Sequence, residues 1–161
     1  MSEPSSDGWI PRVAGAVLRT RWVVRAPIFV YKARLGGIFG KRLLMLEHTG
    51  RKSGRPRNVV LEIIDRPTDG GFVVVSGFGD AAQWYRNIQA HPGVRLYLGS
   101  HRPVDAIAMP LGPDEATASL RRYADNYPKA WAALRPVLEN TLGSAINIDC
   151  TNLPMVLVTP S

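Results

Sequence analysis

The stretch His48-Thr49-Gly50-Arg51-Lys52-Ser53-Gly54-Arg55-Pro56-Arg57 decides how the rest of the chain is interpreted. It places four cations within seven residues, among two glycines, a proline and two hydroxyls. Apolar runs with the character of strands flank it, at residues 42–47 and 58–65. The stretch is therefore predicted to be a hairpin tip. Its backbone N–H groups, hydroxyls and basic side chains can together bind an anion, and the alternative is a solvated charged turn.

Further turn signals divide the rest of the chain into strands. Asp69-Gly70-Gly71 predicts a tight turn, and Gly99-Ser100 predicts another. The strands expected around these turns cover residues 72–76, 94–98 and 101–109, and a closing strand is expected at 153–159. Six strands, mostly in hairpins, predict a mainly β fold of the α+β class, namely a small antiparallel barrel with peripheral helices.

Helices are expected at residues 81–91, 113–126 and 129–142. Pro113, Asp114 and Glu115 form a favourable first turn, since proline and acidic residues suit a helix N-terminus. The chain has no regular alternation of strand and helix, no Gly-x-Gly-x-x-Gly after a first strand and no Walker sequence. A doubly wound nucleotide-binding sheet is therefore not expected.

The first 40 residues are predicted to form a unit apart from the barrel domain, which covers residues 41–161. A polar tail is followed by basic amphipathic helices at residues 9–24 and 28–35. These helices could contact an anionic membrane surface, form a lid, or simply pack on the domain. No stretch here is apolar enough to cross a bilayer, so a cytoplasmic protein is expected, with peripheral contact to the inner face of the membrane as a possibility.

The composition points to an anionic partner. The net charge is +7 and the pI is about 10.1, which suits nucleic acid, phospholipid or a multiply charged small molecule. The basic residues are not interleaved with aromatic residues as in a single-strand groove, so nucleic acid is not expected. Cys150 is the only cysteine and the three histidines lack ligand spacing, so neither a disulfide nor a metal site is expected.

A second group of candidate residues follows the third strand. Ser76-Gly77-Phe78-Gly79 is a loop whose glycines would let a flat ligand approach the backbone. Trp84 and Tyr85, with Asn87, could form an aromatic wall with an amide, or pack in the core. Tyr127 could line the mouth of a pocket, or it could belong to the packing face of a helix. No nucleophile, base and orienting group occur together, so any redox chemistry would come from a cofactor.

Together, the segments at residues 49–57, 76, 84–87 and 91–92 closely resemble the deazaflavin (F420)-dependent nitroreductase and quinone reductase family. The resemblance runs from about Gly36 to Ala108. It implies a split antiparallel β-barrel of the flavin-reductase-like kind and coenzyme F420, whose phosphate and glutamate tail would meet the basic tip. The cofactor-binding residues that it implies are Arg51, Lys52, Ser53, Arg57, Asn58, Ser76, Gly77, Phe78, Trp84, Tyr85 and Asn87.

The resemblance also implies hydride transfer from reduced F420 to a quinone-like or other electron-poor acceptor. Ser76 and Tyr127 are the implied catalytic residues. Many relatives have a lysine where this chain has Gly77, and tyrosines where it has Ala130 and Ala133. These departures weigh against nitroimidazole-type activity. A relative that uses FMN and a non-catalytic binder of fatty acids or other acidic lipids are the alternatives.

Overall fold

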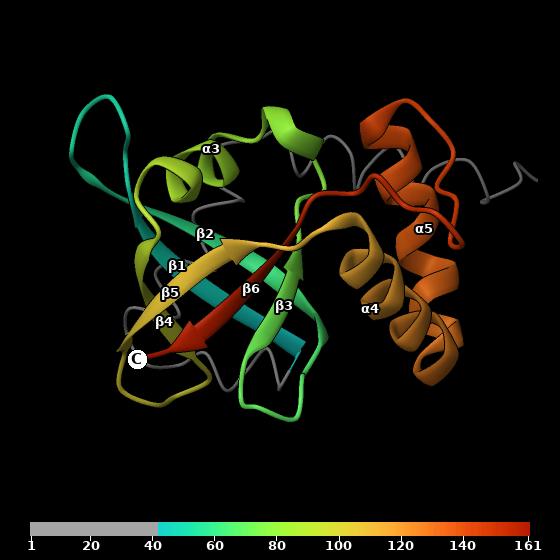
Figure 1. Cartoon of the computed structure of the whole chain (residues 1–161), viewed down its shortest axis with the longest axis horizontal. Coiled ribbons are helices and arrows are strands. Elements are labelled where there is room, and N and C mark those ends of the chain that lie inside the picture. Colours follow the sequence, from blue (N-terminus) through green and yellow to red (C-terminus); the bar gives the residue numbers. More distant parts are fainter. Residues whose placement is uncertain (1–41) are drawn as a thin grey trace, which may run out of the picture.

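The computed structural model describes residues 42–161, in which six strands form a closed antiparallel barrel (Figure 1). Around the barrel the order is β1-β2-β3-β6-β5-β4. The strands are β1 (Leu43–Thr49), β2 (Pro56–Asp65), β3 (Phe72–Val75), β4 (Gly93–Leu98), β5 (Val104–Pro110) and β6 (Met155–Pro160). The predicted antiparallel barrel is therefore confirmed.

Prolines explain where two strands begin later than predicted. β5 begins at Val104 rather than at residue 101, directly after Pro103, and β6 begins at Met155, directly after Pro154. Proline has no N–H to donate to a sheet ladder, so it is disfavoured inside a strand. The two predicted turns are confirmed, because Gly70 and Gly99 both have positive φ, at 95° and 55°.

The helix predicted over residues 81–91 is two elements. A 3₁₀ turn, η3 (Gly79–Ala81), comes first and α3 (Gln83–Ala90) follows. Ala82 separates them because its backbone is extended, with ψ at 129°. The single predicted helix was therefore wrong in its first turn, and the extended residue sets the direction in which α3 crosses one end of the barrel.

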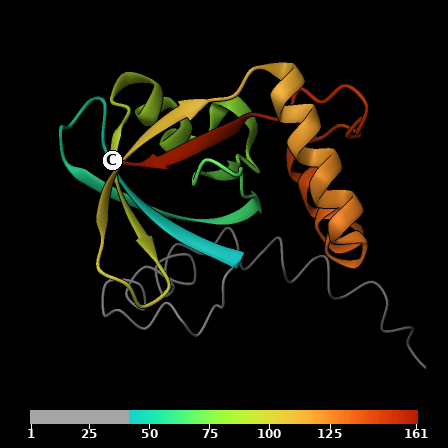
Figure 2. The same cartoon turned by 60° about the horizontal axis from the view of Figure 1, so that its bottom comes forward.

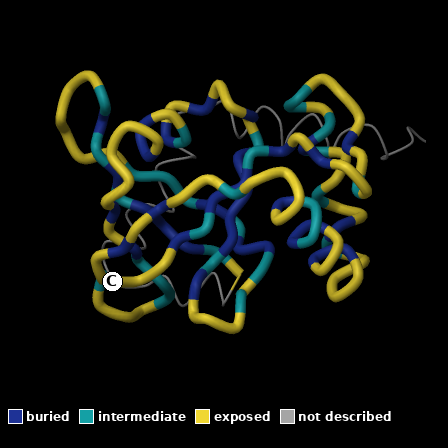
Figure 3. Tube along the Cα trace, viewed as in Figure 1, coloured by how far each residue is buried: buried dark blue, intermediate teal, exposed yellow. Residues whose placement is uncertain are grey.

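Two further helices pack side by side on the outside of the barrel, as Figure 2 shows. They are α4 (Pro113–Asn126) and α5 (Pro128–Leu142). Their apolar faces meet the outer surface of β2, β3 and β6 in a second core that includes Ile64, Leu120 and Trp131. The first core fills the barrel itself, where Leu44, Leu46 and Val156 are buried (Figure 3). The barrel is thus covered on one side by α4 and α5, and α3 closes one of its ends, because Trp84 and Ile88 belong to the barrel core.

Polar bonds fix α4 on the barrel. Tyr123 donates a 2.8 Å hydrogen bond from its hydroxyl to the carboxylate of Glu62, and Arg122 bonds Asp65 at 2.6 Å. Desolvation, followed by the charge and hydrogen bond of Glu62, raises the pKa of Tyr123 to about 12. These bonds hold the helix at a fixed register on β2.

The predicted N-terminal unit and its membrane contact fall on residues 1–41 and lie outside the described part of the chain. Within residues 42–161, no helix is long and apolar enough to span a bilayer. The same residues contain no group of three or more side chains that could hold a metal ion.

Candidate functional site

The basic loop, residues 50–55, connects β1 to β2 at one end of the barrel (Figure 1). Two backbone bonds close it, from Gly50 N to the Arg55 carbonyl and from Gly54 N to the Gly50 carbonyl, both 2.8 Å long. Gly54 has a φ of 67°, in the left-handed region that side chains other than glycine rarely adopt. A methyl group on Gly50 would lie 2.7 Å from Ser53 Oγ. Both glycines are thus required by the shape of the predicted hairpin tip.

Helix α3 holds the base of this loop. The Oδ1 atom of Asn87 accepts hydrogen bonds from the backbone N of Arg51 at 3.1 Å and from Arg51 Nη1 at 2.9 Å. The Nδ2 atom of Asn87 lies 3.2 Å from Nδ1 of His48 on β1. The structure therefore brings together Arg51 and Asn87, which are 36 positions apart and were both predicted to bind a cofactor.

The other cations of the basic stretch, two in the loop and Arg57 at the start of β2, are exposed. Lys52, Arg55 and Arg57 make no ion pair with any acidic side chain of residues 42–161, whereas Arg42, Arg95, Arg121, Arg122 and Arg135 are all paired. The hydroxyl of Ser53 accepts a 3.3 Å bond from Arg55 N within the loop. Three exposed cations in and directly after a closed loop suit a phosphate with further carboxylates, since several converging donors bind such anions better than one charge.

Arg57 and Asn58, both predicted cofactor ligands, lie on opposite faces of β2, because successive strand residues alternate. Arg57 is paired in register with His48, on the face that continues into the barrel, whereas Asn58 is opposite Glu47. The Oδ1 atom of Asn58 is buried and has no hydrogen-bond partner among the described residues. The structure thus places Asn58 on the face of β2 opposite to Arg57.

The loop after β3 is closed by its own serine. Ser76 is fully buried, and its hydroxyl donates a 2.6 Å hydrogen bond to the Gly79 carbonyl. Gly77 and Gly79 pack against α5, because a Cβ on either would lie 3.3 Å from Leu138 or Leu142. Phe78 is 57% exposed at the tip. The Ser76 proton is therefore bonded within the loop, and its predicted catalytic role stays a prediction.

The two aromatic residues of α3 have different environments. Trp84 is buried in the barrel core. Of the two alternatives for this residue, an aromatic wall beside a ligand or packing in the core, its position corresponds to the second. Tyr85 packs edge to face against Trp84, with ring centroids 5.9 Å apart. Tyr85 also lines a pocket of about 540 Å³. Desolvation and the nearby charge of Asp80 raise the pKa of Tyr85, which keeps the phenol protonated at neutral pH.

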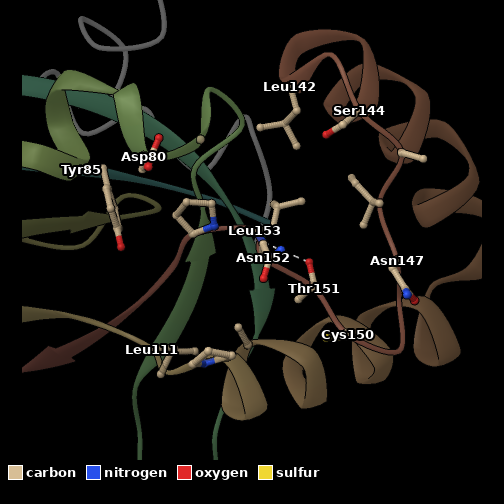
Figure 4. A pocket seen from close by; sticks show the side chains of 16 residues that line it. Asp80, Tyr85, Leu111, Leu142, Ser144, Asn147, Cys150, Thr151, Asn152 and Leu153 are labelled. Carbon is tan, nitrogen blue, oxygen red and sulfur yellow. Dashed lines mark hydrogen bonds between the residues drawn. The ribbon is translucent and has the colours of Figure 1, made fainter.

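Figure 4 shows this pocket, hereafter the η3 pocket. Asp80 and Tyr85 form one side, and Leu142, Ser144 and Asn147 lie across from them. Its floor comes from the start of α4 and from the segment before β6, including Cys150, Thr151 and Leu153. The lining is mostly apolar and uncharged polar, with Asp80 as its one acidic side chain, which suits a flat, oxygen-bearing molecule without negative charge.

Tyr127 lies away from these residues. It is 55% exposed at the break between α4 and α5, beside Arg42 and Tyr123, and lines another pocket with them. The Ser76 loop contacts the opposite end of α5, near Leu138 and Leu142. A helix of this length spans about 20 Å at 1.5 Å per residue. The structure therefore does not bring Tyr127 and Ser76 together at one site.

Sequence reasoning missed His48 as a residue of the site. It is 5% exposed and contacts Asn87 beneath the basic loop. The signal was present, because Leu44, Leu46 and His48 alternate along one strand face. The segment 144–154 of the η3 pocket was also missed, and it carries no motif that could have indicated it.

The fold and this site define a class: a split β-barrel protein with a loop of exposed cations at one end and a pocket between η3, α4 and α5. The model of the F420H(2)-dependent quinone reductase family matches residues 24–135. The chain therefore belongs to this family and is an F420H2-dependent oxidoreductase. A curated relative from Mycobacterium tuberculosis (strain ATCC 25618 / H37Rv), the putative F420H(2)-dependent quinone reductase Rv3178, is 40% identical over 102 residues. The match covers 58% of this chain and 81% of that relative.

Solved structures of low identity share the fold. An F420-H2 dependent reductase, FDR-A, is 22% identical with a TM-score of 0.51, over 73% of this chain and 94% of that one. The heme storage protein HutZ from Vibrio cholerae is 12% identical with a TM-score of 0.52, over 86% of this chain and 90% of that one. The split barrel alone thus does not select a ligand.

Proposed function

We propose that the protein binds reduced F420 through the basic loop and reduces a quinone-like acceptor in the η3 pocket. The observation that carries this proposal is the closed loop together with the start of β2, where Lys52, Arg55 and Arg57 are exposed without an acidic partner in residues 42–161. F420 has a phosphate and a glutamate tail, so its anionic end is complementary in charge to these donors. Membership of the family gives the cofactor class independently.

When bound, the reduced deazaflavin supplies the hydride. The protein contributes position, an anion-binding loop and hydrogen-bond donors. Arg51, Lys52, Ser53 and Arg57 would bind the phosphate and glutamates, while the loop at Gly77 and Gly79, which packs on α5, would border the other end of the cofactor. These residues fit the cofactor because the loop is already closed in the described structure and its cations are exposed.

Tyr85 would donate a hydrogen bond to an acceptor oxygen in the η3 pocket. Its raised pKa keeps a proton on Oη at neutral pH, and a preorganised donor stabilises negative charge that develops on oxygen. A quinone carries such oxygens on a flat ring. The pocket is about 540 Å³, within the range of small-molecule sites.

The experiment is a fluorescence titration of the protein with F420, FMN and FAD, followed by oxidation of reduced F420 with menadione as the quinone. We expect F420 to bind with a Kd on the micromolar scale, about −8 kcal/mol, and FMN and FAD to bind much more weakly. We also expect oxidation of reduced F420 to depend on the quinone. Absence of F420 binding, together with a co-purifying fatty acid, would instead support a lipid-binding protein.

A further inference from the structure

The side chain of Asn87 is the only described group that contacts both the basic loop and the strand beneath it through side-chain hydrogen bonds. Its two ends have different partners, Arg51 at 2.9 and 3.1 Å and His48 at 3.2 Å. Asn87 and His48 are both 5% exposed, so neither presents much surface to a ligand. Asn87 was predicted to contact the cofactor, and this burial suggests a different role.

The bonds themselves determine the orientation of the amide. Arg51 N and Arg51 Nη1 are both donors, so the end of Asn87 that faces them must be the Oδ1 acceptor. The other end is then the NH₂ donor. The Nδ1 atom of His48 that it faces must therefore accept, which requires a neutral imidazole with its proton on Nε2.

We propose that Asn87 is a positioning residue, oriented by His48, that holds Arg51 and the basic loop in the shape that receives the anionic tail of the cofactor. This inference rests on the proposed function and names the residue that keeps the basic loop of the proposed site in position. It assigns no ligand contact to Asn87. Only two backbone hydrogen bonds within the loop close it. The two hydrogen bonds that Asn87 accepts from Arg51 therefore double the number of bonds that hold the loop in place.

The electrostatic environment of His48 agrees with this geometry. Burial, and after it the charge of Arg57, lowers the pKa of His48 to about 4. The ring is therefore neutral at pH 7 and can accept the bond from Asn87. A neutral ring also adds no charge that would repel Arg51 or Arg57, which keeps the loop compact while it carries several cations.

The first test is a double-mutant cycle on F420 binding with the full chain. The variants are Arg51→Ala, Asn87→Ala and the double variant, and Gln89→Ala on the exposed face of α3 is the matched control. If Asn87 acts through Arg51, Asn87→Ala weakens binding about tenfold in the parent and by clearly less in the Arg51→Ala background, where only its bond to the backbone N of residue 51 remains to be lost. Losses that multiply in the double variant would show a separate contact of Asn87 with the cofactor and would overturn the proposal.

Two further measurements do not need the cofactor. The ¹⁵N shifts of His48 in the unliganded protein should show the Nε2–H tautomer, and an Nδ1–H tautomer would overturn the assigned orientation. Trypsin should cut after Lys52 about tenfold faster in Asn87→Ala than in the parent or in Gln89→Ala, and equal rates would overturn the positioning role. If the parent protein binds no F420, the proposed function fails, while the tautomer and the cleavage rates still decide whether Asn87 holds the loop.

Discussion

The hydroxyl of Ser76 donates a 2.6 Å hydrogen bond to the carbonyl oxygen of Gly79, inside the turn that follows β3. This bond closes the turn that leads through η3 and α3 to the site. Because Ser76 is fully buried and Gly79 has a φ of 67°, the turn has one well-defined conformation. The serine thus shapes the wall of the η3 pocket, of which Gly79 is a part.

Replacing Ser76 with alanine should therefore lower stability as well as activity. The change leaves the Gly79 carbonyl with only the 3.4 Å bond from the backbone N of Ala82, and the loss of a hydrogen bond of this kind costs about 0.5–1.5 kcal/mol. Urea unfolding should show a loss of this size, and the KM for the quinone should rise because the pocket wall moves. A variant of unchanged stability with a lower kcat would instead support direct contact of the hydroxyl with the acceptor.

Tyr127 should contribute little to turnover. It lies about 20 Å from the Ser76 loop, at the other end of α5, beside Arg42 and Tyr123. We expect Tyr127→Phe to change kcat/KM by less than about twofold. Tyr85→Phe, which removes the phenol of the η3 pocket, should lower it about tenfold or more. Steady-state oxidation of reduced F420 measures both, and the opposite ranking would place the acceptor at the α4–α5 break.

The stability of the protein should decrease as the pH is lowered through the range in which His48 titrates. The folded pKa is about 4, below the ordinary value of 6.5, because burial and Arg57 disfavour the charged ring. The unfolded chain then binds a proton first as the pH falls. The free energy of unfolding should therefore decrease between pH 6.5 and about 4, by at most about 3 kcal/mol from this group, and then level off.

Urea unfolding of the parent and of His48→Gln at several pH values isolates this effect. The variant lacks the titrating ring, so its stability should fall less across the same window. Parallel curves for the two proteins would show that the ring does not remain neutral and buried in the fold.

The positive φ of Gly54 gives a separate test of the loop. Nothing lies within 4 Å of a Cβ placed there, so Gly54→Ala adds backbone strain without a clash. We expect a loss of about 1 kcal/mol in stability and weaker F420 binding, while Gly54→Asn should be milder because asparagine tolerates the left-handed region. Equal effects of the two substitutions would indicate that the side chain, rather than the backbone conformation, causes the loss.

Much of the barrel could be predicted from local signals. Glycine turns and alternating apolar residues identified the strands, and prolines 103 and 154 account for two boundaries that were placed too early. The basic loop was also located correctly, because Gly50, Gly54 and the cations are adjacent in sequence. The contact that holds this loop could not be predicted, because Asn87 is 36 positions from Arg51 and no local pattern links them.

The candidate site could likewise be predicted only in part from the sequence. Trp84 and Tyr85 are neighbours, and the sequence could not tell which is buried, because that depends on the angle at which α3 crosses the barrel. The extended backbone of Ala82 sets this angle. The η3 pocket depends on residues 144–154 folding back beside α4, a tertiary contact that leaves no periodic signal.

The most direct test of the central claim is the affinity for F420 of Lys52→Ala/Arg57→Ala, measured against the parent and against Arg102→Ala. Arg102 is an exposed arginine in the β4–β5 turn, at the opposite end of β1 from the basic loop. Each charge-assisted contact is worth about 1.5–3 kcal/mol, so the double variant should bind at least about a hundredfold more weakly while Arg102→Ala binds like the parent. An unchanged Kd in the double variant would contradict the assignment of the basic loop as the anchor of the cofactor.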